Sequence, residues 1–182
     1  MIPKRRLLCL SGSLRKASYN KALIQAACIL APSEVELVIF EGMGQLPLFN
    51  PDLETDLPTT VRELRHAVRL SDGLLIASPE YAHGISSVLK NALDWLVSGD
   101  EFPSKPVSIF NTSPRATHAQ AALREVIKTM SGIVIEEASI AVPLLGSHYR
   151  VQEIVSDPDI SNLLQQAIRA FIDAIDRCEL NR

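Results

Sequence analysis

A cluster of small polar side chains with one arginine lies near the start of the chain. It follows an apolar run at 7–10 and precedes a helical pattern that begins at residue 21. Backbone N–H groups and the positive end of a helix dipole favour a bound phosphate at such a strand–turn–helix junction. The same residues also fit a plain polar turn with a helix N-cap. The side-chain donors of a phosphate site here would be Ser11, Ser13, Arg15, Ser18 and Asn20.

A second polar loop, 78–84, follows the apolar run at 73–77. Pro79 restricts the backbone after this strand, and Gly84 permits a close approach or a positive φ. Backbone groups between them could bind the edge of a flat heterocycle, with Tyr81 as an aromatic wall. A phosphate turn and a ring-binding loop together indicate a ligand with a phosphate at one end and a planar ring at the other. Flavin mononucleotide (FMN) has that shape.

Apolar strand-like runs alternate with helical patterns along the whole chain. Strands are expected at 7–10, 35–40, 73–77, 107–110 and 133–142, and helices at 21–30, 59–70, 86–97, 119–130 and 159–178. This alternation predicts an α/β fold, a flavodoxin-like three-layer sandwich with a five-stranded parallel sheet in the order 2-1-3-4-5. Ligands of such sheets bind at the carboxyl ends of the strands, so the two polar loops and a third, 111–118, should converge on one edge.

Composition limits the class of protein and its partners. The 182 residues, 47% of them hydrophobic and 21% charged, suit one globular domain spanning 1–182. A formal net charge of −3 argues against nucleic acid as a partner. The three cysteines are widely spaced and read as reduced thiols, and the four histidines have no metal-ligand spacing, so no metal is expected. No apolar stretch is long enough for a membrane span, which favours a cytoplasmic protein.

Three motifs in combination resemble the NAD(P)H-dependent FMN reductase family. They are the segments 11–20, 78–84 and 89–95, which follow the first and third strands in the expected order. The family consists of flavodoxin-like proteins and includes quinone, azo-dye and chromate reductases. The resemblance extends from residue 7 to about residue 130. It departs from the family at His83, where many members have asparagine, and at 115–118, where many have a glycine-rich loop.

The resemblance implies an FMN-dependent oxidoreductase in which the cofactor carries the chemistry, so no protein side chain is assigned a catalytic role. Hydride would pass by ping-pong exchange from NAD(P)H through FMN to a small-molecule acceptor, namely a quinone, a flavin, an azo compound or a metal oxyanion. The helix at 86–97 would help to form a homodimer or homotetramer. The residues implied to bind FMN are Ser11, Ser13, Leu14, Arg15, Ser18 and Asn20 around the phosphate, Pro79, Glu80, Tyr81, Ala82, His83 and Gly84 around the ring, and Ser113 from the third loop.

Other chemistries fit parts of the same pattern. Cys9 and Arg15 have the C-x₅-R spacing of a cysteine phosphatase, but Lys16 stands where that family has serine or threonine. A dinucleotide-binding Rossmann enzyme is disfavoured because the first turn has one glycine, Gly12. A non-enzymatic flavodoxin-type electron carrier or redox sensor is the main alternative. Steady oxidation of NAD(P)H by the holoprotein would distinguish the enzyme from the carrier.

Overall fold

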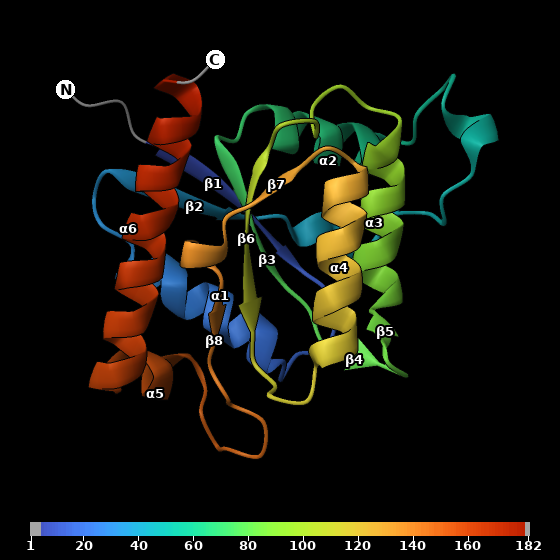
Figure 1. Cartoon of the computed structure of the whole chain (residues 1–182). Helices are drawn as coiled ribbons and strands as arrows, with labels where there is room; N and C mark the ends of the chain where they lie inside the picture. The colour runs from blue at the N-terminus through green and yellow to red at the C-terminus, as the bar shows by residue number, and fades with distance from the viewer. Residues whose placement is uncertain (1–4, 181–182) are drawn as a thin grey trace.

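A parallel sheet with helices on both faces forms the body of the protein (Figure 1). The computed structural model describes residues 5–180. The strand order is β2-β1-β3-β6-β7, with β8 also paired to β6, so the expected topology is confirmed. The sheet strands are β1 (Arg5–Ser11), β2 (Val35–Ile39), β3 (Gly73–Ala77), β6 (Pro106–Asn111), β7 (Ile133–Val134) and β8 (Ile140–Ala141). The helices are α1 (Tyr19–Leu30), α2 (Thr59–Arg69), α3 (Ser87–Val97), α4 (Thr117–Thr129), α5 (Val151–Ser156) and α6 (Pro158–Leu180), with short 3₁₀ turns η1 (Glu41–Gly44), η2 (Pro51–Leu53) and η3 (Glu136–Ala138).

The apolar strands divide their side chains between two cores because successive residues of a strand point to opposite faces. Leu7 and Cys9 of β1 pack on one face with α1, α5 and α6. Leu8 and Leu10 pack on the other face with α2, α3 and α4. All four side chains are buried. A sheet covered on both sides explains why its central strands are apolar without alternation.

The expected strand at 133–142 is interrupted. The turn η3 separates β7 from β8, and both short strands pair with β6. Side chains fix this break: the Ser108 hydroxyl donates to the carbonyl of Ala138 at 2.8 Å, and the Ser139 hydroxyl accepts from the N–H of Ile109 at 3.1 Å. These bonds replace the strand-to-strand bonds that the turn removes.

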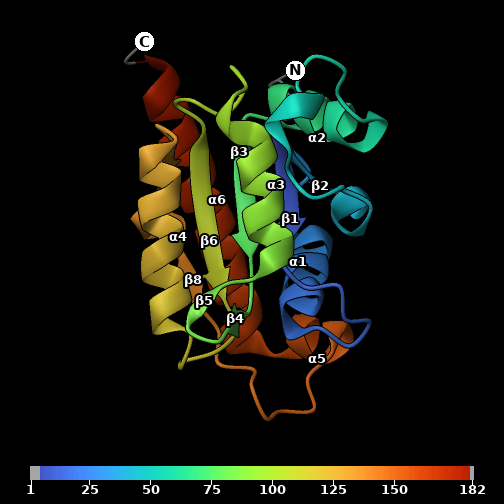
Figure 2. The ribbon, with the colours of Figure 1, turned by 90° about the vertical axis from the view of Figure 1, so that its right-hand side faces the viewer.

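A two-stranded hairpin that the sequence did not indicate lies between β3 and α3. Its strands are β4 (Glu80–Tyr81) and β5 (Gly84–Ile85). The turn between them has positive φ at Ala82 (48°) and His83 (58°). Of the two options that Gly84 allowed, a close approach or a positive φ, the structure does not use the second, because the left-handed conformation falls on the two residues before it. Figures 1 and 2 show this hairpin projecting at the carboxyl end of the sheet.

The proline-rich segment 45–58 is attached to α3. The Asn91 side chain accepts from the N–H of Phe49 at 2.8 Å and donates to the carbonyl of Pro47 at 2.9 Å. The Trp95 indole donates to the same carbonyl at 2.8 Å, and its ring meets Phe49 edge-on. Asn91 and Trp95 of the 89–95 motif therefore have a structural role, because they hold this segment against the helix.

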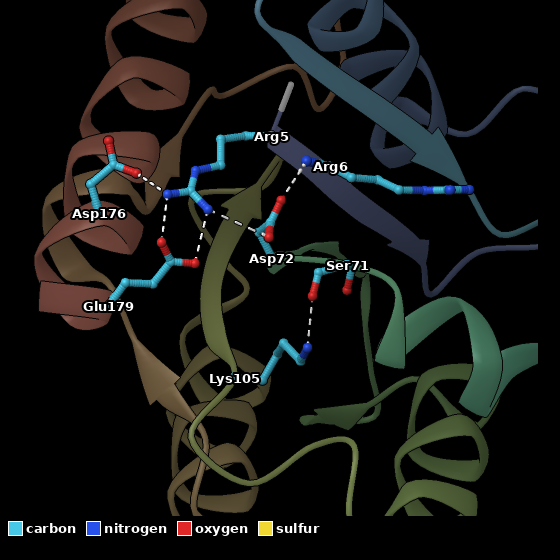
Figure 3. A network of polar contacts seen from close by, with 7 residues as sticks. All are labelled: Arg5, Arg6, Ser71, Asp72, Lys105, Asp176 and Glu179. Carbon is cyan, nitrogen blue, oxygen red and sulfur yellow. Dashed lines mark hydrogen bonds and ion pairs between the residues drawn. The ribbon is translucent and has the colours of Figure 1, made fainter. Parts of the chain in front are cut away.

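An arginine network closes the amino end of the sheet, opposite the polar loops (Figure 3). Arg5 at the start of β1 donates to Asp176 at 2.6 Å and to Glu179 at 2.8 Å, both on α6. The Asp72 carboxylate accepts from the N–H of Arg6 at 2.7 Å. The bonds of Arg5 attach the last helix to the sheet, and the bond of Arg6 joins β1 to the segment before β3. Among residues 5–180, no helix is both long and apolar enough to cross a membrane.

Candidate functional site

The loops that follow β1, β3 and β6 meet at the carboxyl edge of the sheet (Figure 2). Their residues line a cavity of about 290 Å³. This volume lies near the lower end of the roughly 300–1,000 Å³ that is typical of small-ligand sites. The three loops therefore converge as expected. The cavity lining includes the predicted residues Ser13, Arg15, Ser18, Asn20, Pro79, Glu80, Tyr81 and Ser113.

The first turn of α1 presents donors to this cavity. Ser18 is the N-cap, and its hydroxyl accepts from the N–H of Lys21 at 3.3 Å. Within residues 5–180, no hydrogen bond engages the N–H groups of Tyr19 and Asn20. Free N–H groups at the positive end of a helix dipole suit a phosphate.

A buried hydrogen bond orients Asn20. The Thr112 hydroxyl, from the loop after β6, donates to the side-chain oxygen of Asn20 at 3.1 Å, and both residues are buried. Because this oxygen is engaged, the group that Asn20 can offer to a ligand is its NH₂ donor. Together with the hydroxyls of Ser13 and Ser18 and the guanidinium of Arg15, this donor set fits the phosphate of FMN.

Gly12 brings the first loop into direct contact with the second. Its N–H donates to the carbonyl of Ala77 at the end of β3 at 2.9 Å. A Cβ at this position would lie 2.7 Å from the hydroxyl of Ser86, the N-cap residue of α3. The hydroxyls of Ser78 and Ser86 are themselves 3.1 Å apart. Only a residue without a side chain fits here.

The carboxylate of Glu80 is used within the protein. One oxygen accepts from the N–H of Ala119 near the start of α4 at 2.8 Å, and the other lies 3.1 Å from Nδ1 of His83. The N–H of Ala119, followed by His83, lowers the pKa of Glu80. The N-cap of α4, Ala116, has no capping side chain, so Glu80 serves that helix end. Tyr81, with 53% of its surface exposed, keeps an aromatic face available.

Five predicted residues do not line this cavity. Ser11 and Leu14 line a neighbouring cavity on the other side of the β1–α1 loop. The Ser11 hydroxyl donates to the carbonyl of Ser13 at 3.3 Å, so it shapes the turn. The others, Ala82, His83 and Gly84, form the tip of the hairpin outside the lining.

Several lining residues were not predicted. Thr112 and Arg115 belong to the loop after β6, which the sequence marked as polar without assigning residues beyond Ser113. Leu145 comes from the loop after β8, and the Tyr19 hydroxyl donates to the carbonyl of Ser147 in the same loop. No sequence signal placed this last loop at the site. The remaining additional lining residues are Ala17, Ser78 and Ala116.

The cysteine-phosphatase alternative is wrong. Cys9 is fully buried in the core beneath α1. A hydrogen bond with the Cys28 thiol and burial raise the pKa of the Cys9 thiol well above its usual value. A nucleophilic cysteine needs an accessible thiolate, which this environment disfavours.

Known proteins match most of the chain. A family model described as NADPH-dependent FMN reductase matches residues 5–144. An NAD(P)H-dependent FMN reductase of Pseudomonas aeruginosa is 31% identical over 172 residues, which cover 91% of this chain and 92% of that protein. A 2-hydroxy-1,4-benzoquinone reductase of a Burkholderia species is 36% identical over 137 residues, covering 72% and 74%.

Solved structures agree with this match. The flavoenzyme NAD(P)H:(acceptor) oxidoreductase FerB of Paracoccus denitrificans superposes with a TM-score of 0.84 at 28% identity, covering 95% of this chain and 98% of that one. A flavodoxin, WrbA-like protein of Agrobacterium tumefaciens shares the fold, with a TM-score of 0.59 at 13% identity over 96% and 98% of the two chains. The flavodoxin-like fold, the oxidoreductase class and FMN as cofactor are therefore confirmed. The chain belongs to the NADPH-dependent FMN reductase family.

Proposed function

We propose that this protein uses FMN to pass hydride from NAD(P)H to a quinone or a similar small-molecule acceptor, in two half-reactions that share one site. The observation that carries the proposal is the single cavity formed by the donor-rich start of α1 and the β4–β5 hairpin. FMN needs a phosphate site and a ring site about one cofactor length apart, and we assign the first to the start of α1 and the second to the hairpin.

The phosphate end of the site is the start of α1. The guanidinium of Arg15 would form charge-assisted hydrogen bonds to the phosphate, and the hydroxyls of Ser13 and Ser18 would complete its coordination. The Asn20 NH₂ group, oriented by Thr112, adds a further donor. Every one of these groups donates, so the set suits a dianion.

The ring end is the hairpin and the loop after β6. Pro79 and Tyr81 would provide a flat apolar boundary for the ring, and Ser113 also lines the cavity. Backbone N–H groups of the hairpin would stabilise negative charge at the pyrimidine edge of the flavin, an oxyanion-type contribution. When bound, FMN supplies hydride acceptance and release, while these residues bind and orient it.

The names of two relatives support the proposed acceptor class. The Burkholderia relative is named for a benzoquinone, and FerB is named for a general acceptor. A planar quinone would enter the same aromatic boundary that receives the nicotinamide, so the two substrates would bind in turn. We also propose a homodimer or homotetramer acting in the cytoplasm. The match to a family of reductases disfavours the flavodoxin-type carrier.

The test of the phosphate site is Arg15→Ala. Loss of a charge-assisted contact worth about 1.5–3 kcal/mol should weaken FMN binding about 10- to 100-fold in a fluorescence titration. Arg169→Ala, an exposed arginine on α6, is the matched control and should bind FMN like the wild type. Equal FMN affinity in the two variants would contradict the assigned site.

The test of the enzyme class is turnover. Holoprotein should oxidise NADPH or NADH continuously when a benzoquinone is supplied, with parallel lines in double-reciprocal plots at several quinone concentrations. Flavin that is reduced once and does not turn over would favour the carrier. Intersecting lines would contradict ping-pong exchange while leaving the oxidoreductase class intact.

A further inference from the structure

A second cavity, of about 410 Å³, lies on the other side of the β1–α1 loop. Residues 39–41 and 43–45, at the end of β2 and in or next to η1, line it on the side away from the loop. Ser13 and Arg15 line both cavities, so the two adjoin across this loop. The loop is the blue segment before α1 at the lower right of Figure 2. A ligand longer than the first cavity could therefore continue into the second.

The second cavity has an excess of positive charge. Arg15, Lys16 and Lys21 line it together with one carboxylate, Glu41. Lys21 Nζ lies 3.0 Å from an oxygen of Glu41, which neutralises that pair. The side chains of Arg15 and Lys16 have no ion pair or hydrogen bond within residues 5–180. Uncompensated cations grouped around a cavity favour an anionic ligand, and a phosphate above all.

The same cavity has an apolar side. Leu14, Phe40 and Met43 line it. Leu14 has 59% of its surface exposed. Its side chain lies against Gly44, because a Cβ added to Gly44 would lie 3.2 Å from a methyl carbon of Leu14. A large apolar side chain beside unpaired cations is suited to a flat ring that carries a phosphate nearby.

We propose that this second cavity binds the adenosine end of the reduced pyridine nucleotide, with the 2′-phosphate of NADPH against Lys16 and Lys21. The inference rests on the proposed function, because that function brings NAD(P)H to the first cavity. With FMN in the first cavity, the nicotinamide would lie against the flavin ring at the open side of that cavity, and the rest of the nucleotide would extend past Arg15 into the second. Leu14 and Phe40 would contact the adenine, and Lys16 would discriminate NADPH from NADH, which lacks the phosphate.

The primary test is Lys16→Gln in the FMN-loaded enzyme, with the ratio of KM for NADPH to KM for NADH as the measurement. Loss of one exposed charge-assisted contact should raise this ratio about five- to tenfold. The control is Lys128→Gln, which removes an exposed lysine from α4 and should keep the wild-type ratio. An unchanged ratio in Lys16→Gln would overturn the inference.

Glu41→Gln tests the same site in the opposite direction. It removes the negative charge of the cavity and releases Lys21 from its ion pair. The KM ratio should therefore fall, and adenosine 2′,5′-bisphosphate should inhibit the NADPH reaction more strongly in this variant and more weakly in Lys16→Gln. A ratio that rises in both variants would contradict a phosphate in this cavity.

Leu14→Ala tests the adenine contact. Because both nucleotides carry adenine, the variant should raise KM for NADPH and for NADH to the same degree. FMN affinity, measured by flavin fluorescence in each variant, distinguishes failure of the proposed function from failure of the nucleotide site. If the chain binds no FMN and oxidises neither nucleotide, the proposed function fails; if it binds FMN and turns over while the ratios stay fixed, this inference alone fails.

Discussion

A methyl group on Gly12 would lie 2.2 Å from the hydroxyl oxygen of Ser78 and 2.7 Å from its Cβ. The two residues follow neighbouring strands, β1 and β3, and the contact leaves no space for relaxation. The loop proposed to bind the FMN phosphate and the loop proposed to frame its ring are therefore packed as one unit. A displacement of one should move the other.

Gly12→Ala should accordingly affect both ends of the site. Overpacking of this kind costs about 1–3 kcal/mol in stability, which urea denaturation would measure. FMN affinity should fall as well, because the added methyl group pushes Ser78 and the hairpin away from the first loop. The double variant Gly12→Ala with Ser78→Gly removes the clashing hydroxyl and should recover part of the stability. Failure of this second change to recover anything would show that the clash lies elsewhere.

Glu80→Gln should reveal a pH-dependent attachment of the hairpin to α4. The N–H of Ala119 holds the pKa of Glu80 below its usual value in the folded protein. A lowered carboxyl pKa contributes stability above the unfolded pKa of about 4.3, and that contribution is lost as pH falls through the lower folded pKa. At pH 7 the melting temperature of the wild type should be higher than that of Glu80→Gln. This difference in melting temperature should disappear as the pH is lowered. A constant gap across this range would exclude the charge as its cause.

Ala82→Gly should stabilise the protein. Ala82 has a φ of 48°, a left-handed conformation that costs an L-residue about 1–2 kcal/mol. After allowance for the greater unfolded-state entropy of glycine, the gain should be about 0.5–1 kcal/mol. Gly84→Ala is the matched control for stability, because a Cβ there would have its nearest contact at an ordinary 3.6 Å. A destabilised Ala82→Gly would contradict the assigned turn geometry.

Glu101→Gln should also stabilise, with the opposite pH dependence to Glu80→Gln. The Glu101 side chain is 1% exposed, and one of its oxygens has no hydrogen bond, although Arg65 lies 3.5 Å away. Burial raises its pKa. Stability from a raised carboxyl pKa is complete below the unfolded value and is lost as pH rises through the folded value. At pH 7 the melting temperature of Glu101→Gln should lie about 2–4 °C above that of the wild type, which corresponds to about 1 kcal/mol. Near pH 4 the two melting temperatures should be equal. A lower melting temperature at pH 7 would show that the ion pairs outweigh the burial.

The sheet order was predictable because largely apolar strand-like runs alternate with helical patterns along the chain. The break between β7 and β8 was not, since it depends on hydroxyls of Ser108 and Ser139 that bond across the sheet. The β4–β5 hairpin was missed for a related reason. Its turn consists of Ala82 and His83, which carry none of the Asn-Gly signal of such turns.

Site residues were predictable as a group and less so individually. The sequence placed Ser18 and Asn20 at a helix start, where position alone determines what they face. It could not show which way the side chains of Ser11 and Leu14 point, because an irregular loop lacks the regular repeat that relates sequence position to side-chain direction in a helix or strand. The use of Glu80 as a helix cap depends on α4, 39 residues further along the chain, and no local pattern indicates that contact.

The bond from Thr112 to Asn20 has a consequence for choosing between a cofactor and its precursor. With the amide oxygen of Asn20 engaged by Thr112, every side chain that we assign to this end can donate a hydrogen bond to the ligand, and those of Arg15 and Asn20 can only donate there. Riboflavin ends in a hydroxyl that cannot receive so many donors at once. The vitamin should therefore be left in solution while its phosphorylated form is retained.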